Sequence, residues 1–156
     1  MIEKTPYALE FLWNQIELAY TEVRKKKYKE LLEKLIFNEN IRKRVEKAKD
    51  KKGRNYEGGL LEATASQVSL MMCMYDNYPE LDIDLLLTAA ILKGICKTYT
   101  KKECYKIVEN YPEVVPFLFK KSRKKPTPEL TVFDGIEKLD NKVFLRLYKR
   151  RVADGS

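Results

Sequence analysis

The 156-residue chain contains no histidine, which removes the side chain most often used for acid–base chemistry near neutral pH. Histidine is also a principal ligand of zinc, manganese and iron. Histidine-based metal sites, histidine general bases and every catalytic triad that contains imidazole are therefore excluded. The sequence also has no Walker loop, no GxGxxG and no nucleophile elbow. Much conventional hydrolase chemistry is absent.

Basic residues are the strongest remaining chemical signal. Lysine and arginine number 31 against 23 acidic residues, a formal net charge of +8. Clustered basic side chains attract phosphate backbones by releasing counterions, which favours nucleic-acid binding. The candidate nucleic-acid-binding residues are Arg42, Lys43, Arg44, Lys51, Lys52, Arg54, Lys120, Lys121, Arg123, Lys124 and Lys125. Two alternatives stay open: these side chains are hydrated surface residues with no binding role, or they bind an acidic protein partner.

Several aromatic residues lie beside the basic segments. Tyr99, Tyr105 and Tyr111 could stack on unpaired bases, or they could cap the helical core with their hydroxyls in water. Trp13 lies on an apolar stripe and is either part of the core or part of a docking face.

The three cysteines, Cys73, Cys96 and Cys104, are odd in number and lack CxxC spacing. Zinc sites and redox motifs use close cysteine pairs, so neither is expected. Cys73 and Cys96 lie in apolar runs and are predicted to be buried, reduced thiols. The sequence shows no signal peptide and no apolar run long enough to span a bilayer, which indicates a cytoplasmic protein without membrane contact.

The elements that position these residues are predicted to be helices. Thr5 and Pro6 form a cap followed by proline, and an apolar stripe then runs from Leu9 to Ile36 as one long first helix. A short basic helix ends near Lys52-Gly53, and five more helices are predicted over 60–78, from Asp82 or Asp84 to Cys96, from Thr100, over 112–119 and from Thr127-Pro128. The last helix carries a stripe of Val132, Ile136, Leu139, Val143 and Leu147.

No strand alternation is present, so the fold class is predicted to be all-α. A single domain of about seven helices spans 1–152, and the polar residues 153–156 are predicted to form a disordered tail.

The segment RNYEGGLLEATASQVSLMMCMYDNYPELDIDLLLTAAILKGICKTYT, residues 54–100, resembles the HD-domain superfamily of metal-dependent phosphohydrolases. The likeness is greatest to the HD domain of bacterial 3′-to-5′ exoribonucleases that pair it with an OB fold. The matching residues are Tyr56, Gly58, Gly59, Leu60, Leu61, Glu62, Thr64, Tyr78, Pro79, Leu81, Asp84, Leu85, Leu86, Leu87, Leu92, Ile95 and Lys97. The segment 126–143 is similar to the stretch that supplies the family's last metal ligand. The resemblance implies an HD-like helical domain.

The family's metal ligands are replaced throughout. Its paired histidines fall on Gly53 and Arg54, its next histidine on Ala63, its His-Asp doublet on Lys93 and Gly94, and its last aspartate on Glu137. An HD site depends on imidazole and carboxylate ligands that hold divalent cations. The resemblance therefore implies a pseudoenzyme with no metal and no other cofactor.

Two carboxylate pairs remain as possible magnesium ligands. Asp82 with Asp84 is better explained by helix capping. Glu137 with Asp140 is better explained by a family-like pair that braces the fold.

Lys93 falls where the family has a metal ligand. Its ammonium is predicted to replace the cation and pair with Glu137. In the alternative, Lys93 turns to the surface and apolar side chains fill the old cavity.

The resemblance also implies that Arg54, Lys121, Arg123 and Lys124 ring the former entrance. The predicted function is a catalytically inactive HD-like domain that binds single-stranded RNA or DNA, or serves as an accessory subunit of a nucleic-acid-processing machine. The alternative is a protein-interaction scaffold docked through the first helix. A third possibility is a residual enzyme that uses Lys93 or Lys97 with carboxylates.

Overall fold

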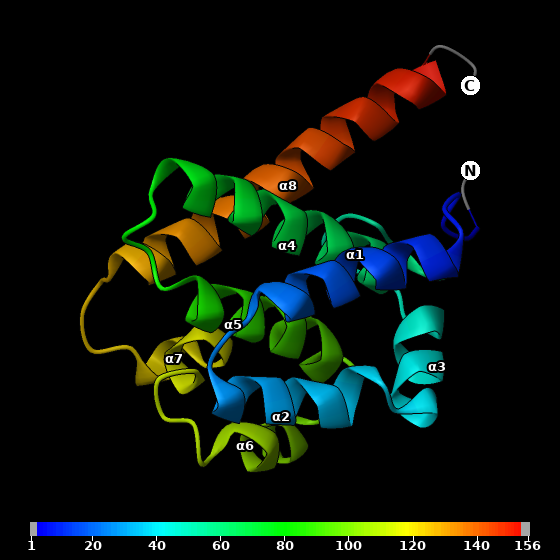
Figure 1. The fold of residues 1–156 in the computed structure, drawn as a ribbon. Coiled ribbons are helices and arrows are strands. Elements are labelled where there is room, and N and C mark those ends of the chain that lie inside the picture. The colour runs from blue at the N-terminus through cyan, green and yellow to red at the C-terminus, as the bar shows by residue number, and fades with distance from the viewer. Residues whose placement is uncertain (1–2, 154–156) are drawn as a thin grey trace.

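The computed structural model describes residues 3–153 (Figure 1), and within them the chain forms eight α-helices and no strand. The predicted all-α fold is confirmed. The helices are α1 (Leu9–Glu22), α2 (Lys26–Ile36), α3 (Glu39–Lys47), α4 (Gly59–Asn77), α5 (Ile83–Cys96), α6 (Lys101–Val108), α7 (Val115–Leu118) and α8 (Pro128–Ala153), with a 3-10 turn, η1 (Lys120–Ser122), before α8. The predicted disordered tail lies outside the described residues except for Ala153, where α8 ends.

The predicted long first helix is wrong, because the chain breaks between α1 and α2. Val23 and Lys25 both have extended backbone. The buried carboxylate of Asp84 accepts hydrogen bonds from the backbone N–H groups of Arg24 (3.1 Å) and Lys25 (2.8 Å). Asp84 therefore stabilises the start of α2 from another helix, while Asp82 caps α5 by accepting from Leu85 N–H.

Thr5 does not cap α1, which begins four residues later. Its backbone pairs with Glu57 and its hydroxyl donates to Glu62 Oε1 over 2.7 Å. The N-terminal segment is therefore fixed against the loop before α4. The basic helix α3 also ends earlier than predicted, at Lys47, because Ala48 is extended.

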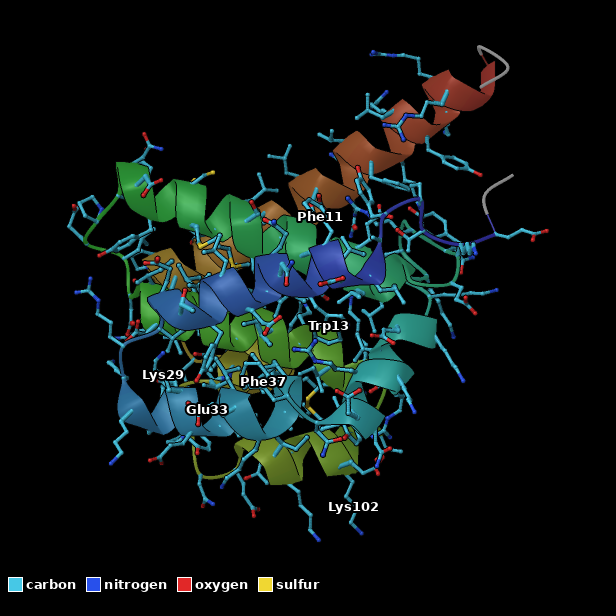
Figure 2. All side chains as sticks on the ribbon, turned by 45° about the vertical axis from the view of Figure 1, so that its right-hand side comes forward. Phe11, Trp13, Lys29, Glu33, Phe37 and Lys102 are labelled. Carbon is cyan, nitrogen blue, oxygen red and sulfur yellow. A yellow bond between two sulfur atoms is a disulfide. The ribbon has the colours of Figure 1, made fainter. Side chains whose placement is uncertain are left out.

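The central helix is α5, as its apolar sequence predicts. It contacts α1, α2, α3, α4, α6, α7 and α8, and it is buried on nearly all sides (Figure 1). Gly94 permits close packing with α4, because a Cβ there would lie 2.4 Å from Thr64 Oγ1. Trp13 (Figure 2) is part of the core at 3% exposed, and its Nε1 donates to Glu46.

The first half of α8 packs against the body, and in the second half Phe144 still contacts Arg54 and Tyr56. The 26 residues of α8 span about 39 Å, and its C-terminal half projects beyond the other helices (Figure 1). Phe133 and Ile136 are buried, but Leu139, Val143 and Leu147 are 57%, 48% and 37% exposed. The second half of the predicted apolar stripe therefore does not face the core.

The cysteine prediction is wrong in two respects. Cys96 and Cys104 form a disulfide that joins the end of α5 to α6, with the Cα atoms 5.4 Å apart, and Cys73 is exposed. Thr100 starts α6 with the predicted capping box, and this turn brings the two cysteines together. Disulfides persist mainly in oxidising compartments, so the cysteines do not support the expected cytoplasmic location. None of the described helices is both long and apolar enough to cross a membrane.

Candidate functional site

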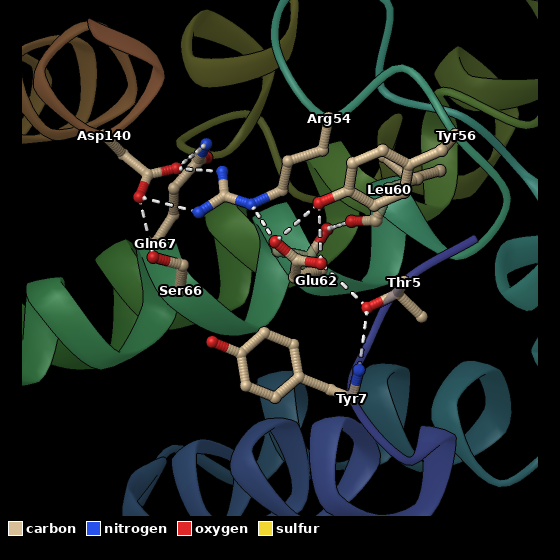
Figure 3. Close-up of polar contacts among 10 residues, drawn as sticks. Thr5, Tyr7, Arg54, Tyr56, Leu60, Glu62, Ser66, Gln67 and Asp140 are labelled. Carbon is tan, nitrogen blue, oxygen red and sulfur yellow. Dashed lines mark hydrogen bonds and ion pairs between the residues drawn. The ribbon is translucent and has the colours of Figure 1, made fainter. Parts of the chain in front are cut away.

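Arg54, predicted to contact nucleic acid, lies at the centre of a buried ion network (Figure 3). Its side chain lies between α4 and α8 and is only 6% exposed as a residue. Nε donates to Glu62 over 2.6 Å, and the two terminal nitrogens donate to both oxygens of Asp140 over 2.8 and 3.3 Å. The guanidinium also stacks over the ring of Phe144 at 4.5 Å. Arg54 is therefore not accessible to a phosphate.

The two carboxylates of this network have further donors. Glu62 accepts hydrogen bonds from the hydroxyls of Thr5 and Tyr56, and Asp140 accepts from Ser66 and Gln67 (Figure 3). Burial opposes the charged guanidinium, but the hydrogen bonds and charges of Asp140 and Glu62 outweigh it and raise the pKa of Arg54. The network joins the N-terminal segment, the loop before α4, α4 itself and α8.

Lys93 and Glu137 form the expected ion pair across α5 and α8. Lys93 Nζ donates to Glu137 Oε2, and its ammonium lies 5.0 Å from the centre of the Phe133 ring. Lys52 lies 3.5 Å from the other carboxylate oxygen of Glu137. One turn further along α5, Lys97 lies 3.7 Å from the buried Asp50. The alternative, with Lys93 turned to the surface, is wrong.

The pKa values of this pair shift in the same direction for different reasons. Burial lowers the pKa of Lys93, the nearby charges of Lys97 and Lys52 act in the same direction, and Glu137 opposes them. Burial alone would raise the pKa of Glu137, but the hydrogen bond and charge of Lys93 and the charges of Lys97 and Lys52 hold it below its ordinary value. The surroundings therefore favour the ionised carboxylate of Glu137, whereas burial works against the charge of Lys93.

Glu137 gives the fold a predicted dependence on acid. Its pKa is lower in the folded chain than in the unfolded chain, so the stability it contributes is complete above the unfolded value of 4.5 and is lost as pH falls through the folded value. Glu137→Gln is expected to flatten the loss of stability below pH 4.5, measured by urea denaturation at successive pH values. Glu109→Gln, at an exposed position after α6, is the control and should keep the wild-type slope. An unchanged slope for Glu137→Gln would contradict the pair.

Two more candidate arginines brace the fold. Arg42 donates to the carbonyl of Ile36, stacks over Trp13 at 4.4 Å and lies 3.6 Å from Glu17. Arg123 binds Asp134 with two hydrogen bonds of 2.6 and 3.0 Å. A third, Arg44, is exposed and stacks over Tyr99 at 4.2 Å. The remaining candidates are exposed: Lys43, Lys51, Lys52, Lys120, Lys121, Lys124 and Lys125.

Five basic side chains lie along the seam of α5 and α8, and they are called the basic strip here: Lys52, Lys97, Lys93, Arg123 and Lys120. The hydrogen bond with Arg123 is the largest cause that lowers the pKa of Asp134, and the charges of Lys120 and Lys93 add to it. Lys93, Lys97 and Lys52 act in the same way on Glu137. Asp134 and Glu137 of α8 therefore each interact electrostatically with three of the five cations, and Lys93 interacts with both acids.

At one end of the basic strip, Lys52 lies outside the carboxylates beside it. The Lys52 side chain is 64% exposed, whereas those of Glu137 and Asp50 are 11% and 3% exposed. At the Lys52 end an anion meets an ammonium group before it meets Glu137 or Asp50. At the Arg123 end the order is reversed, because the side chain of Asp134 is 40% exposed and that of Arg123 is 20% exposed. The sequence did not identify Asp50 or Asp134 as members of this site, because neither ion pair has a spacing that marks it: Asp50 is paired with Lys97, and Asp134 with Arg123 eleven residues away.

The three candidate tyrosines are not equivalent. Tyr99 is held by Arg44, Tyr111 packs near Tyr28, and Tyr105 is 50% exposed with its ring edge-on to Phe119. Only Tyr105 presents much of its ring to solvent.

The carboxylates considered for magnesium have other partners. Asp82 and Asp84 accept backbone hydrogen bonds, and Asp140 binds Arg54. Across residues 3–153 no group of three or more histidine, cysteine, aspartate or glutamate residues is arranged to hold a metal ion.

Of the positions that the resemblance aligns with metal ligands, Ala63 and Gly94 are buried, whereas Gly53 lies in a half-buried turn. Gly94 contacts Thr64, and a Cβ on Gly53 would lie 3.3 Å from Asn141 Oδ1. Comparison with protein-family models, with curated proteins and with solved structures found no match in any of the three.

Proposed function

We propose that this chain is a non-catalytic, HD-like helical domain that binds nucleic acid through the basic strip. The observation that carries the proposal is the group of five cations along the α5–α8 seam, where Lys52 and Lys120 are exposed and the carboxylates of Glu137 and Asp50 are buried. Phosphate groups can reach Lys52 and Lys120 without meeting Asp50 or Glu137. Such contacts are independent of sequence and release counterions.

The Lys93–Glu137 pair supports a role without metal. Glu137 is the carboxylate that the resemblance carries over from the family's ligands, and Lys93 and Lys52 both contact it. Two ammonium groups beside one carboxylate disfavour a divalent cation by electrostatic repulsion. In this proposal the ammonium of Lys93 takes the structural place of a metal cation between α5 and α8.

The proposal predicts salt-sensitive binding that charge reversal on the basic strip weakens. Fluorescence anisotropy with labelled single-stranded RNA, single-stranded DNA and duplex DNA, each at several salt concentrations, measures it. Lys52→Glu with Lys120→Glu is expected to reduce the slope of log affinity against log salt by about two, since each phosphate contact contributes about one. Affinity at low salt should fall at least about tenfold.

The matched control makes the same charge change elsewhere. Lys26→Glu with Lys34→Glu reverses two exposed lysines on α2, which does not contact α8. The control is expected to retain most of the affinity. Equal losses in both variants would show that net charge alone drives binding, and no binding by the wild-type chain at low salt would refute the proposal.

The absence of catalysis is tested on the same labelled strands. They are expected to stay intact when incubated with the protein and manganese, as judged on a denaturing gel. Cleavage that depends on manganese and is lost in Lys93→Ala would contradict the non-catalytic assignment.

A further inference from the structure

Large apolar side chains are exposed on two of the helices that flank α4. Figure 2 labels Phe11 on the side of α1 that faces away from α2. The exposed apolar residues of this region are Tyr7, Leu9, Phe11 and Leu18 on and before α1, and Leu139, Val143, Leu145 and Leu147 on α8. Such contiguous apolar surface on a folded domain marks an interaction site.

Five of these side chains, Tyr7, Phe11, Leu139, Val143 and Leu147, line a groove whose floor is α4. One part is a cavity of about 360 Å³ between the N-terminal segment and α8, lined by Tyr7, Leu70, Val143 and Leu147 above the Arg54 network. A second cavity of about 260 Å³ continues from it along α1, past Phe11. The two cavities share Tyr7 and Ser66, so the groove is continuous. The groove is named the α1–α8 groove.

The two walls of the α1–α8 groove have opposite charge. Helix α1 carries three glutamates and no lysine or arginine. From residue 141 onward, α8 carries basic residues and no acid. Within one chain each wall packs against α4, and the two walls make no extensive contact with each other. Each wall therefore has exposed apolar residues and a charge opposite to that of the other wall, so the two walls are complementary.

We propose that the α1–α8 groove is the interface of a two-fold symmetric dimer. The C-terminal half of α8 from one copy packs against α1 of the other, and the reverse contact forms at the same time. A symmetric interface must be self-complementary, and an acidic apolar wall beside a basic apolar wall meets that requirement. A partner of a single charge sign would be repelled by one wall.

The projection of α8 supports this arrangement. Its residues 139–153 rise about 21 Å along the helix axis, enough to reach across a neighbouring helix of the same kind. The contact would cover Leu139, Val143 and Leu147, which the chain itself leaves exposed. The inference concerns self-association and does not depend on the proposed nucleic-acid binding.

Sedimentation velocity of the nuclease-treated full chain over a range of concentrations tests the dimer. The wild-type chain is expected to approach twice the mass of one chain as concentration rises. Val143→Lys is expected to weaken association at least tenfold, because it places a charge in the apolar contact. Tyr78→Lys makes a similar change at a 56% exposed position at the end of α4 and should associate like the wild type.

A charge exchange identifies the two walls. One variant combines Lys142→Glu with Arg146→Glu on α8, and the other combines Glu10→Lys with Glu22→Lys on α1. Each alone is expected to be monomeric, because like charges then face each other, and an equal mixture is expected to form a heterodimer. A wild-type chain that stays monomeric, association that requires added nucleic acid, or a mixture that does not associate would each overturn the proposal.

Discussion

Arg54→Met is expected to lower the free energy of unfolding by about 3–5 kcal/mol, because it leaves two buried carboxylates without their cation. Glu62 and Asp140 are each less than one-tenth exposed and bind the guanidinium on opposite sides (Figure 3). Thr5, Tyr56, Ser66 and Gln67 would still donate hydrogen bonds, but none of them carries a positive charge. Urea denaturation followed by circular dichroism measures the loss, and the exposed Lys34→Met is the control.

A second variant distinguishes the cost of unpaired buried charge from the cost of lost side-chain packing. Arg54→Met combined with Glu62→Gln and Asp140→Asn removes the cation and both anions together. It is expected to recover part of the lost stability, since uncompensated buried charge is the main cost of the single change. A single change that costs less than about 1 kcal/mol, or a triple change that is worse than the single one, would contradict this account.

Arg54 also shows what the sequence does and does not determine. Its place in a run of basic residues predicted a nucleic-acid contact, whereas the structure places it between two acids that lie 8 and 86 residues away. Neither separation leaves a periodic signal in the sequence. Lys93 is the contrasting case, because the resemblance to the HD pattern predicted its pairing with Glu137 as one of two alternatives, and the pair forms.

The helices that carry their own start signals could be predicted closely. Thr100 with Glu103 starts α6, and Thr127 with Pro128 starts α8, because the capping interactions lie within four residues. The break between α1 and α2 could not be predicted in the same way. Asp84, which stabilises it, lies about 60 residues further along the chain.

The apolar stripe of α8 illustrates a different limit. Periodicity correctly predicted a helix with one apolar face. It could not show that Leu139, Val143 and Leu147 are exposed, while Asp140 and Phe144 of the same stretch contact Arg54. An apolar stripe shows which face of a helix makes a contact, but only the tertiary structure determines what that face contacts.

Gly59→Ala is expected to destabilise the fold by about 3 kcal/mol or more, because the new Cβ would overlap backbone atoms. A Cβ at Gly59 would lie 1.8 Å from the carbonyl oxygen of Arg54. That oxygen is fixed by hydrogen bonds from the backbone N–H groups of Asp50 (3.0 Å) and Tyr56 (2.9 Å), so it cannot move away without breaking them. Denaturation by heat and by urea measures the effect.

Gly135→Ala is the matched control for this change. Gly135 lies inside α8, and a Cβ there would meet no atom within 4 Å. Alanine has the higher helix propensity, so this variant is expected to gain up to about 1 kcal/mol. Opposite signs for the two changes would show that Gly59 is required for the close approach of the loop that carries Arg54. If both variants are equally stable, the loop is not held against the start of α4, and the guanidinium is not positioned by the turn before it.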